Sequence, residues 1–245
     1  PTQLIAGNIY EGLLRYDDKL EPHGLLATAW SRSDDGLTYT FKLKSGVKWH
    51  DGKPFSADDV VFSVDKFLRK THARLRASLE PLESVRAIDA NTVEFKLKYP
   101  FGPFISLFDT GSMPMIPKHI YENTDYATNP ANAKPIGTGP FKLKSYVKGN
   151  AITLERNDGY WGPKPAWQTV KMVAVPNAGP RLTGLMSGDY DLIENPAARD
   201  LARIKEDKKL AFVATPSTRL VFFQPDIGRD KSPFVTAPDG KNPLQ

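Results

Sequence analysis

The sequence lacks several residue types and runs that mark particular kinds of protein. None of its 245 residues is cysteine, which excludes disulfides, thiolate nucleophiles and zinc sites with cysteine ligands. It also lacks any apolar run near the roughly 20 residues that a membrane-spanning helix needs. The first residue is proline rather than methionine. We therefore expect a processed or trimmed start, and the missing leader carries no information about export.

Charge of one sign is nowhere concentrated in the sequence. The 33 Lys and Arg residues are interleaved with 28 Asp and Glu residues, which leaves a formal net charge of +5. No basic run is longer than two residues. Proteins that bind nucleic acid concentrate their basic residues on one face or element. The sequence therefore predicts a solvated surface of mixed charge and no nucleic-acid partner.

Convergent catalytic or metal-binding residues are absent as well. The four histidines have no partner three or four residues away, the spacing that a helical metal site uses, and they are His23, His50, His72 and His119. Paired acidic residues occur only at predicted turns and helix starts, where capping explains them. We expect no catalytic residue, no metal ligand and no cofactor. An enzyme, such as a hydrolase, is the disfavoured alternative from a different functional class.

Two short motifs resemble parts of active sites but favour structural roles. Gly137-Thr138-Gly139 lacks the further residues of a phosphate-binding loop, and Pro140 and a predicted strand follow it instead of a helix. We interpret it as a feature of the backbone. His50 and Asp51 are adjacent near a strand end, where neighbouring side chains point to opposite sides. We interpret His50-Asp51-Gly52 as a turn.

The most informative segment that is present is Thr38–Phe62. Its first part alternates apolar and polar residues with the two-residue period of a half-buried strand, and Asp51-Gly52 marks a turn. Ser56 followed three residues later by Asp59 predicts the start of a helix over Ala57–Lys70.

The rest of the chain mixes helical and strand patterns without strict alternation. We predict strands at Val85–Ile88, Thr92–Tyr99, Phe141–Val147, Ala151–Arg156, Val170–Val175 and Tyr190–Ile193, and helices at Phe104–Phe108, Lys118–Tyr126, Pro180–Ser187 and Arg199–Lys209. Strands and helices mixed in this way favour an α+β, or mixed α/β, fold class.

Six motifs in order resemble the family 5 extracellular solute-binding proteins, which are the peptide and nickel receptors of ABC importers. The six are Tyr10–Leu13 (YEGL), Leu26–Trp30 (LATAW), Thr38–Phe62, Pro135–Phe141 (PIGTGPF), Arg156–Trp161 (RNDGYW) and Gly188–Asp191 (GDYD). Thr28-Ala29 departs from the more usual residues of the second motif. Each motif alone is a moderate signal, and the six in the correct order are a strong one.

The resemblance implies a periplasmic binding protein-like II lobe, with a mixed sheet, flanking helices and an inserted small subdomain at about residues 50–165. It also implies a two-lobed receptor of about twice this length. Residues 1–245 are then expected to be the N-terminal lobe (lobe I), with the second lobe absent from the chain.

The resemblance further implies capture of a di- or oligopeptide in a cleft between two lobes, and delivery to an ABC permease in the inner membrane. The protein is then periplasmic, or extracellular and membrane-anchored in a Gram-positive source. The expected ligand-binding residues from this lobe are Asn8, Tyr10, Glu11, Gly12, Phe108, Asp109, Thr110, Gly111 and Ser112.

Three alternatives stay open at this point. A receptor for nickel, heme or another small solute uses the same scaffold. The hydrolase named above is the second alternative, and an isolated lobe that binds nothing without its missing partner lobe is the third. The Thr38–Phe62 segment identifies the family, but we expect it to build a sheet and a capped helix rather than to touch the ligand.

Overall fold

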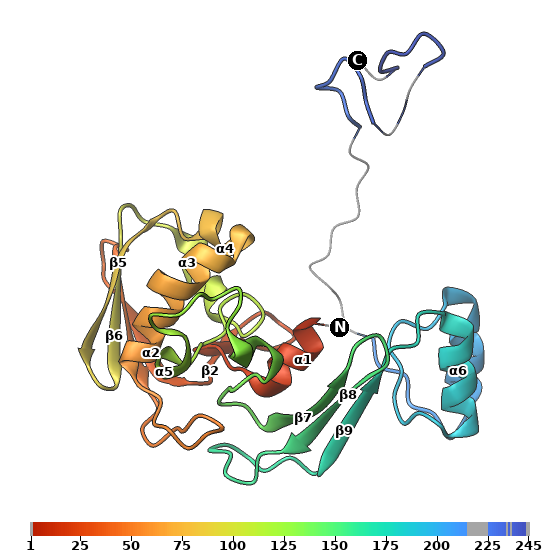
Figure 1. Ribbon diagram of the computed structural model, residues 1–245, viewed down its shortest axis with the longest axis horizontal. Coiled ribbons are helices and arrows are strands. Elements are labelled where there is room, and N and C mark those ends of the chain that lie inside the picture. Colours follow the sequence, from red (N-terminus) through yellow and green to blue (C-terminus); the bar gives the residue numbers. More distant parts are fainter. Residues whose placement is uncertain (1, 215–224, 234, 236, 244–245) are drawn as a thin grey trace. The chain divides into compact units, whose positions relative to one another are not determined.

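A computed structural model describes residues 2–214, 225–233, 235 and 237–243 (Figure 1). These residues divide into two compact units, one up to Ala202 and one from Arg203 onward. The first unit contains all the described strands and most of the helices. The predicted α+β class is confirmed by this mixture of antiparallel sheets and helices.

The largest sheet is built around the strand predicted at the start of the Thr38–Phe62 segment. Its strands are β3 (Ala27–Arg32), β4 (Thr38–Leu43), β5 (Leu82–Asp89) and β6 (Thr92–Leu97), in the antiparallel order β3-β4-β6-β5. Along β4 the side chains of Tyr39, Phe41 and Leu43 are buried and their neighbours are not. The two-residue period seen in the sequence is therefore confirmed.

Helices cover one face of this sheet (Figure 1). They follow one another as α2 (Ala57–Val61), the π-helical segment η1 (Phe62–Leu68), α3 (Arg69–Thr71) and α4 (Ala73–Ser78). The predicted start is confirmed, because Ser56 N–H donates to Asp59 Oδ2 at 3.0 Å. Asp59 Oδ1 also accepts from Lys118 N–H at 2.9 Å, so this buried carboxylate joins α2 to the first residue of helix α5 (Lys118–Tyr121).

Aromatic rings fill the space between β4, β6 and the 3₁₀ helix η2 (Gly102–Phe108). The rings of Phe41, Phe95, Phe104 and Phe108 contact one another with centroids 4.5 to 5.9 Å apart. Tilted and edge-on ring pairs of this kind add to the stability that burial provides. The short helix predicted at Phe104–Phe108 therefore exists as a 3₁₀ helix anchored in the core.

A second sheet and the N-terminal helix form the other part of the first unit. The sheet contains β7 (Phe141–Val147), β8 (Ala151–Arg156) and β9 (Thr169–Val173) in antiparallel order, and a small ladder joins β1 (Leu14–Tyr16) to β2 (Pro22–Gly24). Helix α1 (Thr2–Ile9) lies against β7 (Figure 1). Ile9, Phe141 and Leu154 are buried together at this contact.

The remaining helices are short. They are α5 (Lys118–Tyr121), η3 (Pro130–Ala133), α6 (Ala178–Ser187), η4 (Ala198–Asp200) and α7 (Leu201–Glu206). The helix predicted over Lys118–Tyr126 ends at Tyr121, and Asn123 in the left-handed region (φ 60°) prevents its continuation.

The strand predicted at Tyr190–Ile193 is wrong. Tyr190 N–H instead donates to Gly184 O at 3.1 Å, and its ring packs against Gly184, so the segment folds back on the end of α6. In the described ranges every strand pair is antiparallel, so the parallel component of the expected mixed sheet is not among them.

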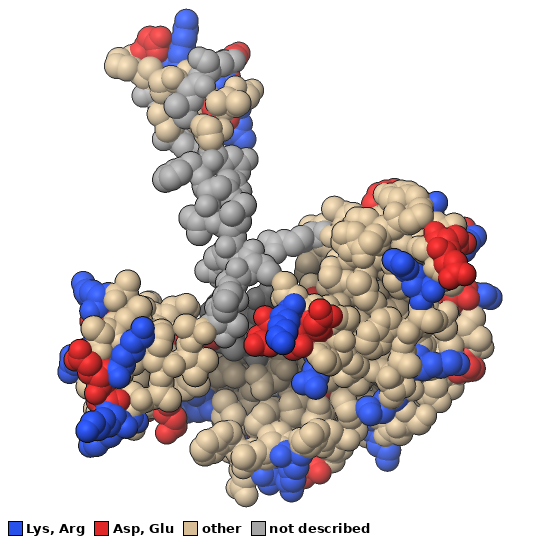
Figure 2. Space-filling model, turned by 180° about the vertical axis from the view of Figure 1, so that it is seen from behind, with Lys and Arg blue, Asp and Glu red and all other residues tan. Residues whose placement is uncertain are grey.

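Two expectations from the sequence, on membrane-spanning helices and on surface charge, can be compared with the described residues. None of the helices they form is long and apolar enough to cross a membrane. Figure 2 shows one face of the molecule, on which Lys and Arg lie among Asp and Glu without a large area of one sign. This face agrees with the mixed-charge surface that the sequence predicts.

Candidate functional site

The two loops that the sequence singled out lie against each other. Gly12 N–H donates to Thr110 Oγ1 at 2.9 Å, and Met115 N–H donates to Glu11 O at 2.9 Å. A Cβ atom at position 12 would lie 2.5 Å from Phe108 O, so only glycine permits this approach. Two segments that are 98 residues apart in the sequence therefore form one local structure.

The nine predicted ligand-binding residues differ in their access to solvent. Three of them, Glu11, Gly12 and Phe108, are buried; five, Asn8, Tyr10, Asp109, Thr110 and Ser112, are half-buried; and Gly111 is exposed. Phe108 places its ring in the aromatic core, so its side chain is not available to a ligand here. Tyr10 packs beside two small apolar clusters, and burial raises the pKa of its hydroxyl.

The loop of residues 109–112 presents backbone carbonyls. Asp109 Oδ1 accepts from Gly111 N–H at 2.7 Å and from Ser112 N–H at 3.1 Å, which fixes the shape of the turn. The carbonyl oxygens of residues 110–112 accept no hydrogen bond from the described residues. Gly111 is exposed and Thr110 and Ser112 are half-buried, so this turn is in contact with solvent.

Glu11 occupies the centre of a polar cluster behind the loops. Its side chain is only 3% exposed. Its carboxylate accepts hydrogen bonds from Thr138 Oγ1 (2.8 Å), Tyr160 Oη (2.7 Å) and Trp161 Nε1 (2.9 Å). Burial raises the pKa of the Glu11 carboxyl, and the three donated bonds oppose that shift. The carboxylate thus joins three sequence motifs into one cluster.

The turn that supplies Thr138 packs directly on the end of α1. Gly139 N–H donates to Ile9 O at 2.9 Å, and a Cβ atom at position 137 would lie 1.8 Å from that same oxygen. Gly137-Thr138-Gly139 is therefore a feature of the backbone, as the sequence predicted, and its glycines are needed for close packing.

Sequence reasoning did not connect Glu11 with Thr138, Tyr160 and Trp161. A usable signal was present, however. A glutamate within an apolar run must find hydrogen-bond donors if it is buried. The GTG and YW motifs carry a hydroxyl, a phenol and an indole N–H that can serve as such donors.

The structure also places the His50-Asp51-Gly52 turn. Gly52 has φ +86° and its N–H donates to Trp49 O at 2.8 Å, which confirms the turn. Asp51 pairs with His119, whose Nε2 lies 2.7 Å from Asp51 Oδ2. His50 contacts the Gly137–Gly139 turn instead. Within the described part of the chain, no three His, Asp or Glu residues are grouped closely enough to hold a metal ion.

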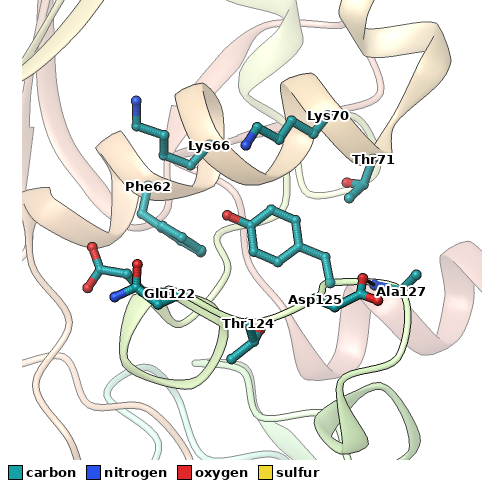
Figure 3. Close-up of a pocket in the computed structure, with 10 residues that line it drawn as sticks. Phe62, Lys66, Lys70, Thr71, Glu122, Thr124, Asp125 and Ala127 are labelled. Atoms are coloured by element: carbon teal, nitrogen blue, oxygen red, sulfur yellow. Dashed lines mark hydrogen bonds between the residues drawn. The ribbon is translucent and has the colours of Figure 1, made fainter.

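A separate surface pocket of about 570 Å³ lies between η1 and residues 122–127 (Figure 3). Phe62 and Tyr126 line it, and Lys66 and Lys70 lie on the helical side. Lys66 is paired with Asp65 at 2.8 Å, and both carboxylate oxygens of Asp125 accept bonds from its own loop. Most of the pocket's charged groups are thus satisfied within the chain, and none of the nine predicted ligand-binding residues lines it.

Comparison with known protein families gives one match that covers most of the chain. Residues 21–238 match the family described as bacterial extracellular solute-binding proteins, family 5. The match includes five of the six motifs, among them the whole Thr38–Phe62 segment.

Individual relatives agree with this match. The chain is 35% identical over 211 residues to the dipeptide-binding protein of Escherichia coli, covering 78% of this chain and 39% of that protein. The oligopeptide-binding protein AppA of Bacillus subtilis, solved with a nonapeptide, has a TM-score of 0.73 at 34% identity, over 84% of this chain and 41% of AppA. NikZ of Campylobacter jejuni, solved with Ni(L-His), has a TM-score of 0.74 at 31% identity, over 82% and 40%. The chain spans about two fifths of the length of these relatives.

Proposed function

Because the chain belongs to the family 5 bacterial extracellular solute-binding proteins, we propose that it contributes one side of a site that captures a di- or oligopeptide. A second lobe supplies the other side, and the closed receptor delivers the peptide to an ABC permease in the membrane. The protein then works in the periplasm, or outside the cell on a membrane anchor. Neither catalysis nor a cofactor is part of this proposal.

The observation that carries the proposal is that the carbonyl oxygens of residues 110–112, in a partly exposed turn beside Glu11-Gly12, accept no hydrogen bond from the described residues. The two loops are held rigidly, since Gly12 donates to Thr110 and its lack of a side chain allows close contact. An extended peptide can donate its own N–H groups to such carbonyls, as a strand does when it joins a sheet edge. Contacts of this type supply affinity without depending on the side chains of the peptide.

Peptide binding can be tested by isothermal titration calorimetry on the chain with a panel of di- to nonapeptides. If backbone contacts dominate, changing peptide side chains has little effect on the dissociation constant. Methylating one contacted peptide nitrogen removes a hydrogen bond of about 1 kcal/mol and weakens binding roughly fivefold. The opposite pattern would refute the proposal, and no saturable binding by any peptide would favour the alternative of a lobe that binds nothing without its partner lobe.

A matched pair of variants tests the loop itself. Thr110→Val removes the oxygen that accepts the Gly12 N–H, whereas Thr110→Ser keeps it. We expect the valine variant to bind peptide several-fold more weakly than the serine variant. Equal affinities would show that the two loops do not need this bond.

The likeness to NikZ supports a second candidate, a receptor for a metal complex or for another small solute such as heme. The two candidates separate in a thermal-shift comparison of peptides, Ni(L-His) and heme at matched concentrations. A peptide that raises the melting temperature favours the first candidate, and a shift with Ni(L-His) or heme alone favours the second. Mass spectrometry of the peptide after incubation detects the hydrolase alternative, because a hydrolase leaves fragments.

A further inference from the structure

His50 holds the Gly137–Gly139 turn through both nitrogens of its ring. Gly137 N–H donates to His50 Nδ1 at 3.2 Å, and His50 Nε2 lies 2.9 Å from Gly139 O. A carbonyl oxygen can only accept, so Nε2 carries the proton and Nδ1 is the acceptor. The backbone adds a third bond, from His50 N–H to Gly137 O at 2.8 Å. This geometry requires a neutral ring in one tautomer.

The residue between the two held glycines is Thr138, which donates to Glu11. The ring of His50 therefore lies at one end of a continuous path of hydrogen bonds. The ring bonds to the turn, and the turn positions the Thr138 hydroxyl. Glu11 accepts hydrogen bonds from that hydroxyl and from the Trp161 indole N–H. The path begins in the Thr38–Phe62 segment, which we expected to build a sheet and a capped helix rather than to touch the ligand.

We propose that His50 is a positioning residue for the candidate site, and that its neutral Nε2–H ring sets the position of Glu11 through the Gly137–Gly139 turn. The connection does not depend on which ligand the site binds. It gives the family-identifying segment a role at the site without any contact between His50 and the ligand.

The surroundings of the ring favour the neutral form. Burial lowers the pKa of His50 to about 4, and Lys142, whose Nζ donates to His50 O at 3.1 Å, acts in the same direction. The hydrogen bond to Gly139 O and the charge of Asp51 raise the pKa and so oppose this shift without cancelling it. A protonated ring would place an N–H at Nδ1 against the Gly137 N–H, and the bond at that position would be lost.

The first test uses the unmodified protein. Long-range ¹H–¹⁵N spectra of the four histidines distinguish the two neutral tautomers and the charged ring. We expect one histidine to stay in the Nε2–H form at neutral and mildly acidic pH and to titrate with a midpoint near pH 4. A spectrum in which every histidine titrates near its ordinary value of about 6.5, or in which His50 is the Nδ1–H tautomer, would overturn the proposal.

The second test asks whether His50 acts on Glu11. In His50→Gln the amide can accept from Gly137 and donate to Gly139, whereas in His50→Leu it can do neither. The readout is hydrogen exchange at the Trp161 indole, with the exposed Trp167 as an internal control. We expect exchange at Trp161 to become roughly fivefold to tenfold faster in the leucine variant, the effect of losing one hydrogen bond, and to stay close to the original rate in the glutamine variant.

Equal exchange in the two variants would overturn the proposal. If the leucine variant does not fold, two measurements still test the proposal. They are the comparison of the glutamine variant with the original protein and the assignment of the His50 tautomer. Peptide titrations on the same samples separate this inference from the proposed function. A protein with the expected exchange pattern and no peptide binding retains the positioning role, because the exchange measurement does not depend on peptide binding.

Discussion

The Glu11 carboxylate provides the sharpest prediction, because burying its charge destabilises the folded state whereas its hydrogen bonds stabilise it. Burial raises the pKa of this carboxyl, so ionisation in the folded state is disfavoured relative to the unfolded state. The two oxygens nevertheless accept from three donors. We infer that the acceptor oxygens, rather than the negative charge, hold the cluster together.

Two substitutions separate these contributions. In Glu11→Gln one oxygen can accept from Thr138 and Trp161, and the amide N–H₂ can donate to the Tyr160 oxygen. The buried charge is gone and only the Tyr160 O–H loses its acceptor, which water can replace at this half-buried residue, so we expect the free energy of unfolding to change by less than about 1 kcal/mol. Glu11→Met leaves three donors without an acceptor. At about 1 to 3 kcal/mol for each, reduced because Tyr160 and Trp161 reach some water, the expected loss is about 3 to 5 kcal/mol.

Urea unfolding followed by circular dichroism at neutral pH measures both changes. Glu83→Met is the matched control, since Glu83 is exposed and pairs with Lys96 on the surface, and we expect an effect within about 0.5 kcal/mol. The pH dependence gives an independent check. A raised pKa means that the folded state holds the proton longer, so this group's contribution to stability is lost as pH rises through its folded pKa, and Glu11→Gln removes that slope. If Gln and Met destabilise equally, the reasoning is refuted and the charge itself is essential.

Three further predictions concern the groups around the cluster. Gly137→Ala places a Cβ atom 1.8 Å from Ile9 O, so the free energy of unfolding measured in urea should fall by more than about 3 kcal/mol. Gly179→Ala in α6 is the control: its Cβ atom meets no atom within 4 Å, and it should raise the free energy of unfolding by up to about 1 kcal/mol. The lowered pKa of His50 means that the unfolded state binds more protons between about pH 4 and 6.5. Relative to His50→Gln, stability should therefore rise with pH across this window by at most roughly 3 kcal/mol, and equal slopes in the two proteins would contradict the assignment. Asp59→Ala removes the acceptor for two backbone N–H groups and should lower the free energy of unfolding by about 2 to 4 kcal/mol, and an unchanged midpoint in urea would show that the cap contributes nothing.

Local patterns in the sequence predicted the elements whose cause is local. The alternation in Thr38–Leu43 is a property of one strand, and the start of α2 depends on residues three positions apart. The hairpin of β7 and β8 also follows from a local signal, since Gly149 adopts φ +75° between them. Tyr190–Ile193 was predicted wrongly because its conformation depends on a tertiary contact and not on a local pattern. Its residues suit a strand, but a strand needs a partner, and contacts with α6 take its place.

The sequence by itself determined the α+β class, the family and the approximate positions of the two loops that meet at Gly12 and Thr110. Each of these depends on short patterns or on motifs in a fixed order. Only the tertiary structure showed that Glu11 is buried, that Thr138, Tyr160 and Trp161 surround it, and that His50 holds the turn that supplies one of them. The physical reason is that a buried carboxylate must be paired, but the chain can provide its donors from any distance in the sequence, here 127 to 150 residues away.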